Sequence, residues 1–103
     1  LVLWTLLAGG NGGVCGTANI FPEKLVSIYN LWKEGHIEEA KKVQKSLTKL
    51  RNVFAHSSFP SIVKAFMKLK GYDVGPPRSP ISTPDEEVID KLKEVIRFYE
   101  DNI

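Results

Sequence analysis

One cysteine and two histidines are the residues of this chain that catalysis or metal binding would most readily use. Cys15 with His36 or His56 as its base would suit nucleophilic catalysis, and the same residue types bind zinc. Neither histidine lies close to Cys15 in the sequence, and the three residues have no metal-ligand spacing. We therefore predict that Cys15 is a small, buried apolar residue and not a catalytic nucleophile, and that there is no metal site.

A glycine-rich segment surrounds Cys15, because five of the eight residues from Gly9 to Gly16 are glycine. A dinucleotide-binding fingerprint that starts at Gly10 would require a glycine where the chain has Cys15. A phosphate-binding P-loop would require a Gly-Lys-Ser/Thr sequence, and the first lysine of the chain is Lys24. The segment therefore predicts a tight turn that leads into a strand, and no nucleotide cofactor.

Basic residues are concentrated between positions 37 and 55, a stretch that contains five basic and only two acidic residues. A nucleic-acid surface would interleave aromatic side chains with these cations, and none is interleaved here. Seven acidic residues lie between Asp85 and Asp101, in and just after the last predicted helix, and the net charge is only +2. We predict a solvated helix face and no nucleic-acid partner. The five basic residues are Lys41, Lys42, Lys45, Lys49 and Arg51.

The amino-terminal part of the chain is uncharged as far as Glu23, and three kinds of segment have this property. The apolar run stops at Ala8, far short of the roughly 18 residues that a membrane span needs. A signal peptide would need basic residues at its start, and a lipoprotein signal would need leucine in place of Gly12. We predict a buried segment of a larger body, with no membrane partner and a cytoplasmic location.

Length and composition fit one ordinary globular domain, with 103 residues, 43% of them apolar and 25% charged. Helices and one strand are predicted along it. The strand lacks polar alternation and is expected to be buried on both faces, as in a parallel sheet. No second strand is predicted, so we expect a piece of a longer protein or a trimmed chain. The elements are the end of a helix at 1–8, a strand at 13–18 and helices at 22–34, about 37–55, 60–70 and 84–100.

Several motifs occur in the order of one enzyme family. The run Gly-Gly-x-Gly-Gly-Val-x-x-Thr-Ala-Asn-x-x-Pro-Glu from Gly9 to Glu23 resembles the last barrel strand and helix of the dihydrodipicolinate synthase / N-acetylneuraminate lyase family. Leu31 to Ala40 is similar to that family's helix, glycine turn and first C-terminal helix. The segment Pro60 to Ala65 resembles its Pro-x-x-Val-Lys-Ala sequence, and Pro77 to Ile81 its Arg-x-Pro sequence.

The resemblance implies an α/β fold class. The chain would be the C-terminal fragment of a (β/α)8 TIM barrel, with the last strand and helix in residues 1–34 and a three-helix C-terminal region in residues 35–103. It would be mostly helical as it stands. The implied parent is a homo-oligomeric lyase or aldolase, a tetramer or dimer, which needs no cofactor. A lysine of the parent forms a Schiff base with pyruvate or another 2-oxo acid. That lysine belongs to an earlier strand, so we expect the fragment alone to be inactive.

Only one position of the family's site falls within this chain. The resemblance places the substrate-binding backbone carbonyl at Val14, two residues after the glycine turn. We also expect Gly13 to need a backbone conformation that a side chain would forbid. Cys15-Gly16 stands where the family usually has Ser-Val, and Ser57 to Pro60 replaces an Asn-Pro helix start.

Two other functions stay open at this point. The loop from Gly71 to Pro76 resembles that of archaeal 2-keto-3-deoxygluconate aldolases, which points to a sugar-acid substrate. A non-catalytic helical binding module would also account for residues 22–103, but it leaves the glycine-rich strand unexplained. Pairing of residues 1–20 into a sheet would distinguish an enzyme fragment from such a module.

Overall fold

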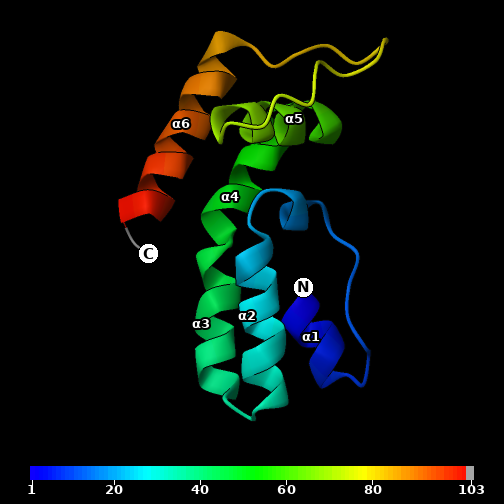
Figure 1. Cartoon of the computed structure of the whole chain (residues 1–103), viewed down its shortest axis with the longest axis vertical. Helices are drawn as coiled ribbons and strands as arrows, with labels where there is room; N and C mark the ends of the chain where they lie inside the picture. The colour runs from blue at the N-terminus through cyan, green and yellow to red at the C-terminus, as the bar shows by residue number, and fades with distance from the viewer. Residues whose placement is uncertain (102–103) are drawn as a thin grey trace. The chain divides into compact units, whose positions relative to one another are not determined.

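The computed structural model describes residues 1–101, in which the chain forms six α-helices and two short 3-10 helices (Figure 1). By packing, the chain divides into two compact units, Leu1–Thr48 and Lys49–Ile103. None of the helices in residues 1–101 is long and apolar enough to cross a membrane. The boundary predicted after residue 34 separates the last unit of a barrel from the helical region that follows it, and it stays a prediction.

The first unit is built from α1 (Val2–Leu7), α2 (Pro22–Lys33) and α3 (Ile37–Ser46), which lie side by side (Figure 1). Pro22 stands in the first turn of α2, where its missing N–H costs no hydrogen bond. The short turn after α2 places α3 antiparallel to it. The apolar faces of the three helices meet in one core, made of Leu3, Leu6, Ile28, Ala40 and Leu47.

A polar contact joins α1 to α3 beside this core. The backbone N–H of Leu3 donates to Oε1 of Gln44 at 3.2 Å. The first N–H groups of a helix have no partner within the helix, so a side-chain acceptor from a neighbouring helix satisfies one of them. Gln44 therefore fixes the start of α1 on α3, although α1 has only six residues and would not be stable alone.

The strand predicted at 13–18 does not form in this chain, and residues 1–101 contain no strand at all. Residues 10–15 are irregular, with extended dihedral angles at Cys15, and Gly16–Asn19 forms the 3-10 helix η1. A strand requires hydrogen bonds to a neighbouring strand. The described residues offer no such neighbour, so the segment cannot form a ladder, and its expected burial on both faces is also wrong.

The long helix predicted at 37–55 is divided at Leu47. It becomes α3, then α4 (Thr48–Val53), then the 3-10 helix η2 (Phe54–His56). The hydroxyl of Ser46 donates to the carbonyl of Val43 at 2.6 Å, and the N–H of Leu47 reaches the carbonyl of Gln44 at 3.3 Å. Such local bonds compete with the regular helical pattern. The apolar periodicity continues across the break, and therefore did not reveal it.

The second unit contains most of α4, with η2, α5 (Phe59–Leu69) and α6 (Glu86–Asp101). Its buried apolar side chains come from all three α-helices. The buried backbone N–H of Leu50 donates to the hydroxyl of Tyr99 at 3.2 Å, which ties α4 to α6. Burial raises the pKa of Tyr99, and the bond from Leu50 acts in the opposite direction. The buried set is Leu50, Val53, Ile62, Phe66, Val88, Leu92, Val95 and Tyr99.

The final helix begins at Glu86, two residues later than its predicted start. The sequence predicts a capping box in which Thr83 caps the helix and Glu86 reaches back. In the structure the carbonyl of Asp85 accepts the N–H of Ile89 at 3.0 Å. Asp85 therefore holds the position just before the first turn, and Thr83 lies in the loop that precedes it.

We expect the 103-residue chain to self-associate while its helices form. Trp4 and Leu7 on α1 are 51% and 44% exposed, and further exposed apolar side chains belong to the same unit. Exposed apolar groups that gather on a small protein favour association. Sedimentation velocity at several concentrations tests this, and the double change Trp4→Gln, Leu7→Gln should shift the chain toward monomer. Tyr72→Gln, at an exposed aromatic residue of the second unit, is the control and should change little.

Candidate functional site

The candidate site begins with the turn that ends α1. The N–H of Gly10 donates to the carbonyl of Thr5 at 2.9 Å, and the N–H of Gly9 donates to the carbonyl of Leu6 at 3.1 Å. Gly9 has a φ of 97°, in the left-handed region that favours glycine. This pair of bonds is the Schellman ending of a helix. The same ending closes α2 at Gly35 and α5 at Gly71.

After this turn the chain runs back along α1 (Figure 1). An added Cβ at Gly10 would lie 2.6 Å from Cγ2 of Thr5 and 2.9 Å from its carbonyl oxygen. At Gly13 an added Cβ would lie 3.1 Å from Cγ2 of Val2. The two glycines therefore let an extended segment pass close to the helix in the opposite direction. A helix followed by an antiparallel, closely packed segment is the arrangement that an αβ unit of a barrel requires.

Val14, the predicted substrate-binding residue, lies at the end of this segment, and its side chain is fully exposed. A Cβ added at Gly13 would face Val2 of α1, whereas the side chain of Val14 faces solvent. The prediction that Gly13 needs a backbone conformation that a side chain would forbid is wrong, because Gly13 does not have a positive φ. The constraint at Gly13 is the close approach of Val2.

Hydrogen bonds within η1 fix the other end of the segment. The carbonyl of Thr17 accepts the N–H groups of Ile20 and Phe21, at 3.0 and 2.9 Å. Asn19 donates from Nδ2 to the carbonyl of Gly16 at 3.2 Å. The side chains of Ile20 and Phe21 are buried, which anchors this turn to the unit. The six residues from Gly10 to Cys15 are thus held at both ends.

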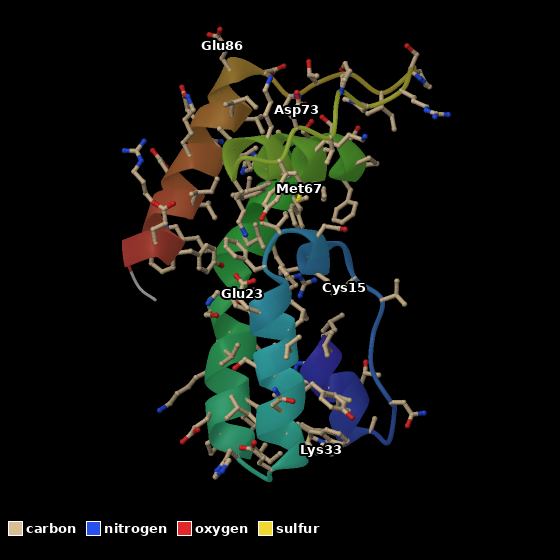
Figure 2. All side chains as sticks on the ribbon, viewed as in Figure 1. Cys15, Glu23, Lys33, Met67, Asp73 and Glu86 are labelled. Carbon is tan, nitrogen blue, oxygen red and sulfur yellow. The ribbon has the colours of Figure 1, made fainter. Side chains whose placement is uncertain are left out.

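The remaining candidate groups do not gather around Val14. Cys15 is a half-buried free thiol just before η1 (Figure 2). His36 lies in the turn after α2, where its Nε2 is 3.8 Å from a carboxylate oxygen of the exposed Glu34. Among residues 1–101 no group of three His, Cys, Asp or Glu side chains could hold a metal ion. The site that this chain offers is therefore made of backbone.

Two of the five basic residues between positions 37 and 55 contact neighbouring side chains of their own unit. Lys41 forms an ion pair with Glu38 at 3.0 Å, one helical turn away. The ammonium group of Lys49 lies 4.4 Å from the centre of the Phe98 ring. Such contacts are typical of solvated helix surfaces.

Comparison with known proteins identifies the family. The model of the dihydrodipicolinate synthetase family matches residues 1–98, and the chain belongs to that family. It is 35% identical over 100 residues to the 4-hydroxy-tetrahydrodipicolinate synthase of Archaeoglobus fulgidus, covering 97% of this chain and 35% of that protein. It is 37% identical over 92 residues to a probable mitochondrial 4-hydroxy-2-oxoglutarate aldolase of Emericella nidulans, covering 89% of this chain and 29% of that protein.

The fold comparison agrees with this assignment. The crystal structure of dihydrodipicolinate synthase from Thermotoga maritima superposes with a TM-score of 0.89 at 24% identity, covering 96% of this chain and 34% of that one. This chain therefore spans about a third of the length of the relatives that it matches. The predicted membership of a lyase and aldolase family is confirmed.

Proposed function

We propose that this chain is the C-terminal part of a class I aldolase or lyase that acts on pyruvate or a related 2-oxo acid. The observation that carries the proposal is the family match over residues 1–98. Residues 1–34 would supply the last βα unit of a (β/α)8 barrel, and residues 35–103 the helical region that follows it. The rest of the barrel would then be the first partner of this chain, and a homo-oligomer the complete enzyme.

The path of the glycine segment supports this role. Residues 10–15 run antiparallel to α1 and lead through η1 into α2, so helix, extended segment and helix alternate in direction. In a barrel the segment would become the last strand once a neighbouring strand supplied its hydrogen bonds. Active sites of such barrels lie at the carboxyl ends of the strands.

In this proposal Val14 contributes its backbone carbonyl to the substrate. A carbonyl oxygen accepts hydrogen bonds, so it can orient a bound 2-oxo acid through a donor on the substrate or through a bridging water. The turn at Gly9 and Gly10 fixes one end of the segment, and η1 fixes the other. The exposed side chain of Val14 has no polar atom, and its part is confined to packing in the complete barrel.

The chain itself is proposed to lack the lysine that forms the Schiff base. Each lysine of residues 1–101 lies in a helix or, at Lys70, caps one. In a barrel of this kind the substrate reacts at the carboxyl ends of the strands, where none of these lysines would lie. The chemistry is therefore assigned to a residue of the full-length protein outside this sequence.

Borohydride trapping tests the proposal. We expect the full-length protein, treated with labelled pyruvate and borohydride, to gain one reduced pyruvyl group on a lysine outside these 103 residues. The 103-residue chain treated in the same way should gain none. Peptide mapping by mass spectrometry locates the label. An adduct on any lysine of this chain, or no adduct on the full-length protein, would refute the proposal.

A second substrate class has its own support in the loop from Gly71 to Pro76, which is similar to that of 2-keto-3-deoxygluconate aldolases. Carbon–carbon cleavage of a sugar acid and condensation of pyruvate with an aldehyde use the same Schiff base. Assays of the full-length enzyme with both substrates decide between them by the ratio of their kcat/KM values.

A further inference from the structure

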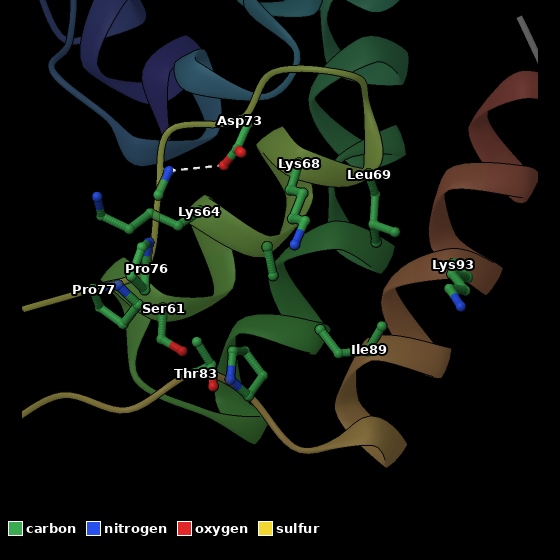
Figure 3. A pocket seen from close by; sticks show the side chains of 13 residues that line it. Ser61, Lys64, Lys68, Leu69, Asp73, Pro76, Pro77, Thr83, Ile89 and Lys93 are labelled. Atoms are coloured by element: carbon green, nitrogen blue, oxygen red, sulfur yellow. Dashed lines mark hydrogen bonds between the residues drawn. The ribbon is translucent and has the colours of Figure 1, made fainter.

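A cavity lies in the second unit, far along the chain from the glycine segment. Its volume is about 630 Å³, and it lies between α5, the loop that follows it and α6 (Figure 3). That volume is within the range of small-molecule sites in proteins. The cavity is lined by residues of positions 61–93 only, so a single unit forms it.

The charge of the lining is strongly positive. Lys64 and Lys68 come from α5, one helical turn apart, and Lys93 comes from α6. Among residues 1–101 none of the three ammonium groups has an ion pair or hydrogen bond. The one carboxylate of the lining, Asp73, accepts the N–H of Gly75 at 3.1 Å within its own loop (Figure 3).

Figure 3 shows how the lysines are arranged. Lys68 extends from α5 toward the space between α5 and α6, Lys93 lies on α6 beyond Ile89, and Lys64 extends to the opposite side of the cavity, near Pro76. Like charges on one helix face repel one another, and an anion between the helices would relieve that repulsion. A lysine is a point charge on a flexible stem, so two of them can close on one oxyanion.

A buried hydroxyl adds an unused donor to this lining. Ser61 is 1% exposed, and its Oγ has no hydrogen-bond partner among the described residues. Buried hydroxyl groups nearly always have one. Ser61 stands in the first turn of α5, on the wall of the cavity. The remaining lining is mainly apolar, with Leu69, Ile89 and three proline rings, which suits the carbon part of a ligand.

We propose that this cavity binds a small organic anion. Lys68 and Lys93 supply the positive charge that attracts its carboxylate or phosphate group, Ser61 donates a hydrogen bond to the ligand, and Leu69 and Ile89 contact its apolar part. The anion joins α5 to α6, so its binding also stabilises the second unit. This site is separate from the 2-oxo acid chemistry proposed for the parent, and does not depend on it.

Equilibrium dialysis of the 103-residue chain tests the site, because it measures bound ligand per chain whatever the association state. The probes are phenyl phosphate, benzoate, inorganic phosphate and the uncharged benzyl alcohol. We expect saturable binding of phenyl phosphate or benzoate, at least tenfold tighter than that of inorganic phosphate or benzyl alcohol. Preference between the two aromatic anions identifies the phosphate or the carboxylate as the natural group.

Matched variants assign the binding to the named residues. The double change Lys68→Gln, Lys93→Gln should weaken binding at least tenfold. Lys42→Gln, Lys45→Gln removes the same charge from α3, outside the cavity, and should change binding less than twofold. Ser61→Ala should weaken it about threefold without lowering the unfolding temperature. Absence of saturable binding, or equal loss in the two double variants, would overturn the proposal. Unchanged binding in Ser61→Ala would contradict the assigned contact between the Ser61 hydroxyl and the ligand.

Discussion

Replacement of Phe66 by alanine is expected to remove a large part of the stability of the second unit. Phe66 is fully buried at the centre of α5. Truncation of a buried phenylalanine costs about 3–5 kcal/mol, because apolar contacts are lost and a cavity remains. A small domain has a total stability of only about 5–15 kcal/mol. Amide hydrogen exchange followed by mass spectrometry should show lost protection in α5 and α6.

Phe59→Ala is the matched control for this prediction. It removes the same kind of side chain from the same helix. Phe59 is 45% exposed and makes an edge-to-face contact with Phe54, with 5.1 Å between the two ring centres. We expect a loss of about 1 kcal/mol, the scale of an aromatic pair. Equal protection of α5 and α6 amides in the two variants would refute the assignment of Phe66 to the core.

Most helices of this chain could be located from the sequence, because characteristic residue types mark where they begin and end. Pro22 stands in the first turn of α2, and Gly35 and Gly71 end α2 and α5. The break at Leu47 could not be found, because it arises from a serine hydroxyl that bonds the preceding turn. The apolar pattern is insensitive to a local change of that kind.

The strand at 13–18 was predicted from composition, and composition does not supply a partner. The residues from Gly13 to Ala18 are uncharged and small, as a buried strand requires. Their backbone groups can form a ladder only with strands that lie outside the described residues. The sequence therefore predicted the segment as it would be beside other strands, whereas residues 1–101 provide no neighbouring strand.

The constraint at the candidate site was predicted for the wrong glycine. The sequence could not distinguish Gly10, Gly12 and Gly13, because the difference among them lies in what each one faces. Gly10 faces the backbone of Thr5, Gly13 faces the side chain of Val2, and Gly12 faces open space. Distances of this kind depend on how the segment packs against α1, and no local pattern encodes them.

Substitution of Gly10 is expected to have the second large effect, because it displaces the segment that carries Val14. Gly10→Ala would bring a Cβ within 2.9 Å of the Thr5 carbonyl oxygen, which belongs to the helix backbone and accepts the N–H of Gly10 itself. The hydroxyl of Thr5 bonds the carbonyl of Leu1 at 3.2 Å, which restrains the other clashing group. The segment must therefore move away from α1, and the carbonyl of Val14 moves with it.

We expect Gly10→Ala to lower the pyruvate affinity of the full-length enzyme at least tenfold, or about 1.4 kcal/mol. Gly12→Ala is the control, because nothing lies within 4 Å of its added Cβ, and it should stay within about twofold. Val14→Ile keeps the backbone and should stay within a few-fold. Pyruvate titration of the three variants measures these effects, and hydrogen exchange at residues 10–15 reports the displacement independently. If Val14→Ile abolished binding while Gly10→Ala left it intact, the substrate would depend on the side chain of Val14 and not on its carbonyl.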